Sequence, residues 1–102
     1  MISKDRLGRV VYSKKGRDQE KIFIVIKVIN DQYVIVADGD FRRIENPKLK
    51  NIRHLQFTNI VDHELVEMLS KDEVPANHVI RKSIKGMLET QHSTGEGGLV
   101  NG

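Results

Sequence analysis

The sequence predicts a mainly β fold with added helix: a small five-stranded barrel, closed or partly closed, followed by two short helices and a disordered tail. Between Gly8 and Thr58 the apolar residues form short runs rich in Val, Ile, Phe and Tyr, separated by turn residues. From Val61 the apolar residues recur with helical spacing instead. The stretch from Gln91 to Gly102 holds four of the eight glycines and almost no apolar residue, so we expect disorder there.

These observations divide the chain into a barrel over residues 1–60, a helical extension over residues 61–90 and a tail over residues 91–102. The strands of the barrel are expected near residues 8–13, 21–29, 33–38, 41–45 and 53–57. A barrel of about 60 residues buries only about 60% of the surface that its unfolded chain exposes. Packing by the rest of the chain should therefore matter for its stability.

The second expected strand is apolar on both faces, and Lys27 is its only charge. Strict alternation would divide it into two sets, with Ile22, Ile24, Ile26 and Val28 on one face and Phe23, Val25 and Ile29 on the other. A strand with one wet face would alternate more cleanly, so this strand is predicted to be central and covered on both sides.

Turn residues separate the later strands. Asn30-Asp31-Gln32 and Asp38-Gly39-Asp40 are predicted hairpin turns, because Asn, Asp and Gly tolerate left-handed backbone angles. The segment Asn46-Pro47-Lys48-Leu49-Lys50-Asn51 is predicted to be a basic loop before the last strand, since proline cannot donate a ladder hydrogen bond.

Two amphipathic helices are expected after the strands. Asp62 is the candidate N-cap of the first, whose apolar stripe is Val61, Leu65, Met68 and Leu69. The second follows Pro75, with an apolar stripe of Ala76, Ile80, Ile84, Met87 and Leu88. These stripes either pack on the uncovered face of the barrel or dock on a partner protein. Arg81, Lys82 and Lys85 lie away from the stripe, as a solvated face or as an extension of a binding surface.

The charge of the chain is unevenly distributed. The net charge of +3 combines 13 Lys/Arg against 7 Asp/Glu in residues 1–60 with 4 against 7 in residues 61–102. A polyanion would therefore be expected to bind the β-rich part. The chain has no cysteine, no membrane span and no apolar signal-peptide core near Met1, and we expect it to be cytoplasmic.

An ordered series of short segments resembles the KOW-domain proteins. The series covers about residues 6–58 and comprises Gly8-Arg9-Val10-Val11, the Lys14-Lys15-Gly16-Arg17-Asp18 turn, the apolar strand at 22–29, Ala37-Asp38-Gly39, Arg42-Arg43, Asn46-Pro47-Lys48-Leu49-Lys50-Asn51 and His54-Leu55. Within that family the chain looks most like small bacterial RNA-binding proteins related to a eukaryotic and archaeal large-subunit ribosomal protein. The resemblance implies an SH3-like β-barrel and a partner that is ribosomal or other structured RNA. Gly16 matches the glycine that marks the first loop of the family.

The predicted function is therefore RNA binding through basic loops, in association with the ribosome. An alternative is a protein-interaction module of the transcription or translation machinery, with a ribosomal or transcription protein as partner. Each Lys or Arg placed on a phosphate releases counterions, and backbone N–H groups around Gly16 can approach a phosphate without a Cβ in the way. The candidate RNA-binding residues are Arg9, Lys14, Lys15, Gly16, Arg17, Lys21, Arg42, Arg43, Lys48, Lys50, Arg53 and His54.

The aromatic residues favour recognition of RNA shape and backbone over base stacking. Strand alternation would bury several of the five, which are Tyr12, Phe23, Tyr33, Phe41 and Phe57. His54 lies in the basic region as a possible RNA contact, although a lone histidine in a strand is more often structural.

The sequence points to no catalytic chemistry, cofactor or metal. His63-Glu64 begins a segment similar to the zinc-protease pattern, but Glu67 stands where the second histidine would be. Asp38 and Asp40 flank Gly39 as hairpin turns require, and Ser13 has no evident base to activate it. We therefore expect a binding protein and not an enzyme.

Overall fold

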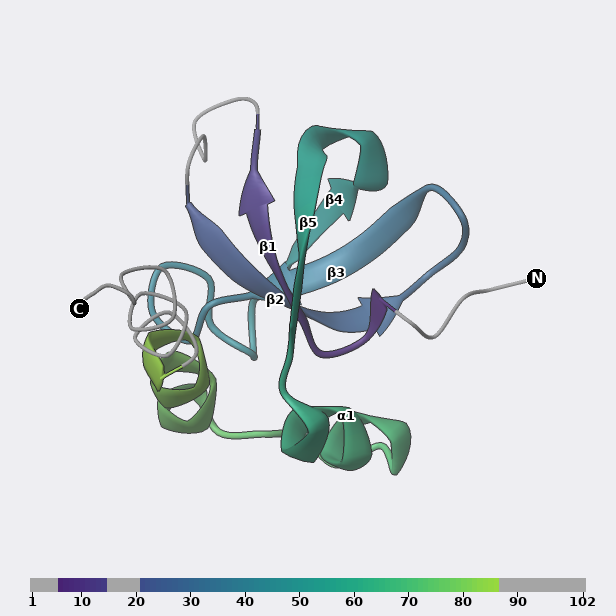
Figure 1. Cartoon of the computed structure of the whole chain (residues 1–102). Coiled ribbons are helices and arrows are strands. Elements are labelled where there is room, and N and C mark those ends of the chain that lie inside the picture. The colour runs from purple at the N-terminus through teal and green to yellow at the C-terminus, as the bar shows by residue number, and fades with distance from the viewer. Residues whose placement is uncertain (1–5, 15–20, 87–102) are drawn as a thin grey trace.

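The protein is a five-stranded antiparallel sheet with two helices on one side (Figure 1). In this computed structural model, residues 6–14 and 21–86 are described, so the predicted disordered tail lies outside the described residues. The strands are β1 (Arg9–Ser13), β2 (Ile22–Val28), β3 (Tyr33–Ala37), β4 (Lys48–Asn51) and β5 (Leu55–Val61). Their order across the sheet is β4-β3-β2-β1-β5, so β2 is central as predicted. The mainly β prediction with two helices is confirmed, and the sheet is not closed over the described residues.

The strand predicted at residues 41–45 is wrong, and β4 lies instead within the segment predicted to be a loop. The Asp38 carboxylate accepts hydrogen bonds from the backbone N–H groups of Asp40 and Arg42, which turns the chain and keeps these groups from a strand ladder. Pro47 lacks only its own N–H, so pairing with β3 begins at the next residue, Lys48.

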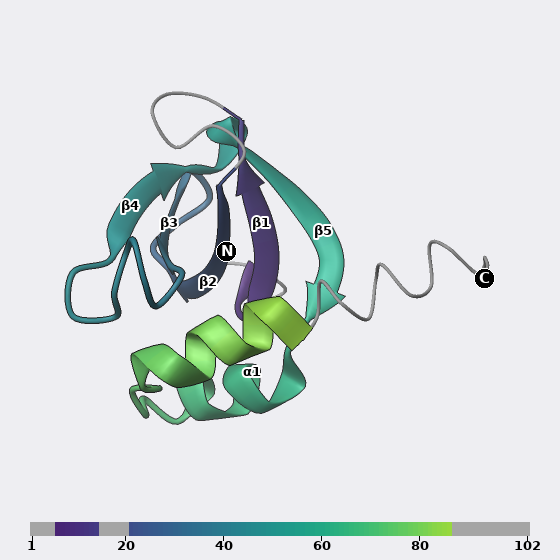
Figure 2. The same cartoon turned by 90° about the vertical axis from the view of Figure 1, so that its left-hand side faces the viewer.

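The last strand is shifted as well, since it begins at Leu55 and not at Arg53. The Asn51 side chain caps a short 3-10 helix, η3 (Ile52–His54), by accepting a hydrogen bond from the Arg53 N–H at 3.0 Å. This turn joins the two edge strands β4 and β5 at one end of a curled sheet (Figure 2).

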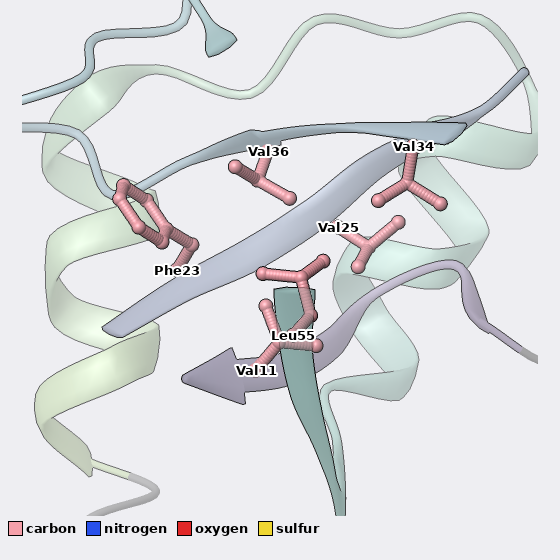
Figure 3. Packing of buried hydrophobic residues seen from close by; sticks show 6 residues of the cluster. All are labelled: Val11, Phe23, Val25, Val34, Val36 and Leu55. Carbon is pink, nitrogen blue, oxygen red and sulfur yellow. The ribbon is translucent and has the colours of Figure 1, made fainter. Parts of the chain in front are cut away.

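One face of the sheet encloses a core made by the strands. Side chains from β1, β2, β3 and β5 point toward one another there (Figure 3); they are Val11, Phe23, Val25, Val34, Val36 and Leu55. The register between β2 and β3 shifts between Val25 and Lys27. After this bulge Val28 packs on the same core, which corrects the strict alternation predicted for the strand.

The helices cover the opposite face of the sheet. Helix α1 (His63–Ser70) begins where predicted, since the Asp62 carboxylate accepts hydrogen bonds from the N–H groups of Glu64 and Leu65. A second helix spans residues 77–86 and lies on the same side of the sheet as α1 (Figures 1 and 2). Both pack on a second core whose buried members are Val10, Ile24, Ala37, Leu65 and Ile80. Of the two destinations considered for the helices, packing on the sheet is the one observed.

The Asp62 carboxylate also accepts a hydrogen bond from the Ser83 hydroxyl, which links the start of α1 to the second helix. Val61, expected on the first helical stripe, is the last residue of β5. Met87 and Leu88, expected on the second stripe, lie outside the described residues.

Candidate nucleic-acid interface

Backbone pairing brings cations from three segments to one end of the sheet. The Ser13 N–H donates to the Lys21 carbonyl at 2.9 Å, and the Lys14 N–H donates to the His54 carbonyl at 2.8 Å. We call the cations Lys14, Lys21 and Arg53, together with the neighbouring His54, the cationic row. Lys14 and Arg53 are exposed, whereas Lys21 and His54 are partly exposed. The Lys and Arg side chains of this row give one end of the sheet a positive potential that attracts anions.

The η3 turn explains how Arg53 joins this row. Ile52 packs against the strand-built core, while Arg53, the next residue in the turn, stays in solvent. The Asn51 cap fixes the turn, so the direction of Arg53 is set by local hydrogen bonding.

A tight loop continues the positive surface beyond Lys21. The N–H groups of Asp38 and Gly39 donate to the Arg42 carbonyl at 2.9 and 3.0 Å, and the Asp38 carboxylate accepts the Arg42 N–H at 2.7 Å. These reciprocal bonds confirm that Asp38 is a turn residue. Phe41 stands at the tip of the loop with 56% of its surface exposed.

Phe41 connects the loop to the cationic row. The Lys21 ammonium lies 4.2 Å from the centroid of the Phe41 ring, within the range of a cation–π contact. The guanidinium carbon of Arg42 lies 5.9 Å from the same centroid. One exposed aromatic ring thus lies close to two cations.

The second helix holds this loop in place. The Arg81 guanidinium donates to the Gly39 carbonyl at 2.6 Å, and the Asn77 side-chain oxygen accepts the Ile44 N–H at 2.7 Å. Gly39 has a φ of +80° and lies against the backbone of Asn77, where a Cβ would not fit. Arg81 therefore anchors the loop, while Lys82 and Lys85 are exposed on the helix.

The two arginines of the loop have different surroundings. Arg43 forms an exposed ion pair with Glu45, with Nε 3.2 Å from Oε2, which offsets part of its charge. Arg42 is partly buried and forms no ion pair with the residues that the structure describes. Its Nε is buried and has no hydrogen-bond partner among them.

The pKa of Glu45 is lowered at this position. The main cause is a hydrogen bond from the Asn77 amide to Glu45 Oε1 at 2.7 Å, followed by a backbone hydrogen bond and the bond from Arg43. All of these interactions favour the charged carboxylate. Glu45 is accordingly a structural partner of the loop.

Three further predicted residues lie on the strands. Lys50 is only 8% exposed, and its ammonium donates to the Ser13 hydroxyl at 3.1 Å. The Arg9 guanidinium donates to the Thr58 carbonyl at 2.9 Å, and Lys48 is partly buried on β4. The side chains of Lys50 and Arg9 are therefore engaged within the sheet and do not belong to the cationic row. Lys15, Gly16 and Arg17 lie outside the described residues.

Phe41 is the candidate site residue that the sequence analysis did not single out. Phe23 is buried as expected, and Tyr12, Tyr33 and Phe57 are partly buried. Phe41 alone among these aromatic residues is largely exposed. The signal was present in the sequence, since Phe41 directly follows the predicted Asp38-Gly39-Asp40 turn.

A second candidate site is an apolar cleft of about 560 Å³ between the sheet and the segment that follows α1. Ile26 and Ile35 line it from the sheet, and Leu69, Val74 and Pro75 line it from the helical side. Val74 is 74% exposed. The charged residues of this cleft are Lys27, Asp72 and Glu73.

The described residues contain no group of three or more His, Asp or Glu side chains that could hold a metal ion. No helix within the described ranges is long and apolar enough to cross a membrane. No protein-family model and no curated protein matches the chain.

Proposed function

We propose that the protein binds structured RNA through the phosphate backbone, and that its curled sheet is an SH3-like barrel of the KOW type. The observation that carries this proposal is the cationic row, in which Lys14, Lys21 and Arg53 come from three segments to one end of the sheet. The strand-built core around Phe23 and Val36 supports the barrel assignment, because a curled sheet encloses it. The activity proposed is binding without catalysis.

Phosphate binding follows from the chemistry of the row. Each cation that neutralises a phosphate releases condensed counterions, so affinity falls as salt concentration rises. If about five phosphates are engaged, the logarithm of the binding constant falls against the logarithm of salt concentration with a slope of roughly −3.5 to −4.5. Arg53 and Arg42 add planar guanidinium groups that can pair with two phosphate oxygens at once.

The test compares two cations of the row with Lys27, which lies near the far end of β2. Lys14→Gln and Arg53→Gln remove charge from the row, and each should weaken binding to RNA of any sequence and reduce the salt slope by about one. Lys27→Gln is the matched control, because exposed Lys27 lies six residues from Lys21 along the chain, about 20 Å away in an extended strand. Fluorescence anisotropy at four salt concentrations measures both quantities.

Two results would contradict the proposal. One is binding that does not depend on salt, which excludes phosphate contacts as its main source. The other is an equal loss of affinity for Lys27→Gln and Lys14→Gln, which indicates attraction by overall charge without a defined surface.

We further propose ribosomal RNA as the RNA partner, on the basis of the family resemblance. Crosslinking in cells, with sequencing of the attached RNA, should give reads concentrated at one ribosomal RNA site. A sucrose gradient of the same lysate should place the protein in large-subunit or ribosome fractions. Protein found only at the top of the gradient, with few crosslinks, would count against ribosome association.

The apolar cleft favours a second candidate function, the capture of a polypeptide segment. Its exposed Val74 suits an apolar side chain, while Asp72 and Glu73 suit a neighbouring basic residue on the partner. Val74→Asp should then abolish recovery of a protein partner from RNase-treated extract, whereas Lys14→Gln should not. Equal recovery by the unchanged protein and Val74→Asp would contradict this function.

A further inference from the structure

The loop that carries Phe41 is fixed before any ligand binds. The Asp38 carboxylate holds its backbone from within, and Arg81 holds the Gly39 carbonyl from the second helix. Asn77 holds the Ile44 N–H on the other side of the tip. A ring presented by a rigid loop loses little conformational freedom on binding, which favours affinity.

Exposure alone does not distinguish Phe41, because single exposed apolar side chains are common on protein surfaces. Ile29, Leu49 and Val74 are also exposed. Phe41 differs in having an aromatic ring with two cations near it, the Lys21 ammonium at 4.2 Å and the Arg42 guanidinium carbon at 5.9 Å from its centroid.

This combination matches the chemistry of one nucleotide. An aromatic side chain stacks on the face of any base, and neighbouring cations meet the phosphates on either side of it. Bases inside a continuous duplex are stacked on each other and cannot reach a protein ring, so the ligand must offer an unpaired base.

We infer that Phe41 is a stacking platform for one unpaired base of the bound RNA, with Lys21 and Arg42 on the adjacent phosphates. The inference rests on the proposed function and adds to it a preference for RNA that contains unpaired bases. The protein binds bulged or looped RNA more tightly than continuous duplex, and Phe41 supplies the difference.

The experiment uses two RNA probes and the full chain. One probe is a hairpin with a randomised eight-nucleotide loop, and the other is a blunt duplex with the same number of phosphates. Phe41→Leu keeps an apolar side chain and removes the aromatic face, so it should weaken hairpin binding about 5-fold to 100-fold. Duplex binding should stay unchanged. Phe41→Tyr keeps the aromatic ring, so it should bind the hairpin as tightly as the unchanged protein does.

Leu49→Ala is the matched control, because Leu49 is an equally exposed apolar residue on β4 without a ring. Leu49→Ala should change neither the affinity for the hairpin nor the affinity for the duplex. Thermal melting of all variants checks that each is folded. Ultraviolet crosslinking to the hairpin should give a crosslinked peptide that contains Phe41, and mass spectrometry of the digest identifies it.

The outcomes separate this inference from the proposed function. If Phe41→Leu leaves hairpin binding unchanged or weakens both probes equally, base stacking is overturned while backbone binding stands. If the unchanged protein binds neither probe, the proposed function fails, and the stacking platform fails with it.

Discussion

The two faces of the sheet are buried by different parts of the chain. The strand-built core joins residues between Val11 and Leu55, all of which lie on strands. The core on the opposite face is completed by Leu65 of α1 and Ile80 of the second helix. Ile80 is as fully buried as Phe23, so both faces of the central strand pack against a buried core. The helices are therefore needed to bury Val10, Ile24 and Ala37.

This difference matters for the proposed interface. The cationic row lies at strand ends and is fixed by backbone pairing and by the η3 turn. The Phe41 loop is fixed by Asn77 and Arg81 of the second helix. One part of the surface thus depends on the sheet alone, and the other depends on the helix-covered face.

The largest expected effect tests whether the helix-covered face is part of one cooperative unit. Ile80→Ala removes a fully buried side chain from that face and should lower the free energy of unfolding by about 2–5 kcal/mol. Urea unfolding is followed by the far-ultraviolet signal of the helices and by tyrosine fluorescence. Both probes should report one transition, because each face buries the other side of β2.

Val36→Ala is the corresponding change in the strand-built core. It should shift the same single transition. If Ile80→Ala instead separates a helical transition from a sheet transition, the helices unfold independently of the sheet. The two faces would then not form one cooperative unit.

Much of this fold was predictable because it depends on local pattern. The apolar run around β2 predicts a central strand, the Val-Ile run of β3 predicts a strand, and Asp62 with Leu65 predicts the start and buried face of α1. The covering of β2 on both sides was predictable from Lys27 being the only charge in that strand.

The remaining features depend on particular side-chain hydrogen bonds, some local and some between residues far apart in the sequence. Lys50 and Arg53 lie three residues apart in one basic segment, yet Lys50 points to Ser13 in the sheet and Arg53 stays in solvent. Charge alone does not separate them, because Lys50 lies on β4 whereas the η3 turn sets the direction of Arg53. The exposure of Phe41 likewise follows from bonds to Asp38 within the loop. Contacts from Asn77 and Arg81 then hold that loop in place.

An intermediate effect tests the link between the helix-covered face and the Phe41 loop. Gly39→Ala places a Cβ against the Asn77 carbonyl at a φ of +80°, so the loop must move from the helix. We expect a loss of about 1–3 kcal/mol in the free energy of unfolding. Hairpin RNA binding should weaken as well, although no charge is removed.

Gly86→Ala is the matched glycine control. It lies in the second helix, and an added Cβ would meet no side chain or backbone beyond its own turn of helix within 4 Å, so Gly86→Ala should raise stability by up to about 1 kcal/mol and leave RNA binding unchanged. Equal RNA binding by Gly39→Ala and the unchanged protein would show that the loop does not need its contact with the helix.

The smallest effect concerns the pH dependence of the same contact. The Asn77 amide, the Glu45 backbone and Arg43 lower the pKa of Glu45, so its charged form favours the folded state. The sign follows from linkage: this contribution is present above the ordinary glutamate pKa of about 4.3 and is lost as pH falls through the lowered value. Because Glu45 is exposed, the gain in stability is small.

In an NMR titration, Asn77→Ala should move the titration midpoint of the Glu45 carboxyl upward toward the ordinary value. With Glu45→Gln, the free energy of unfolding should fall less between neutral and acidic pH than it does in the unchanged protein. An unchanged midpoint in Asn77→Ala would mean that the helix does not hold the loop through this carboxylate, and that the bonds to Gly39 and Ile44 join the helix to the loop.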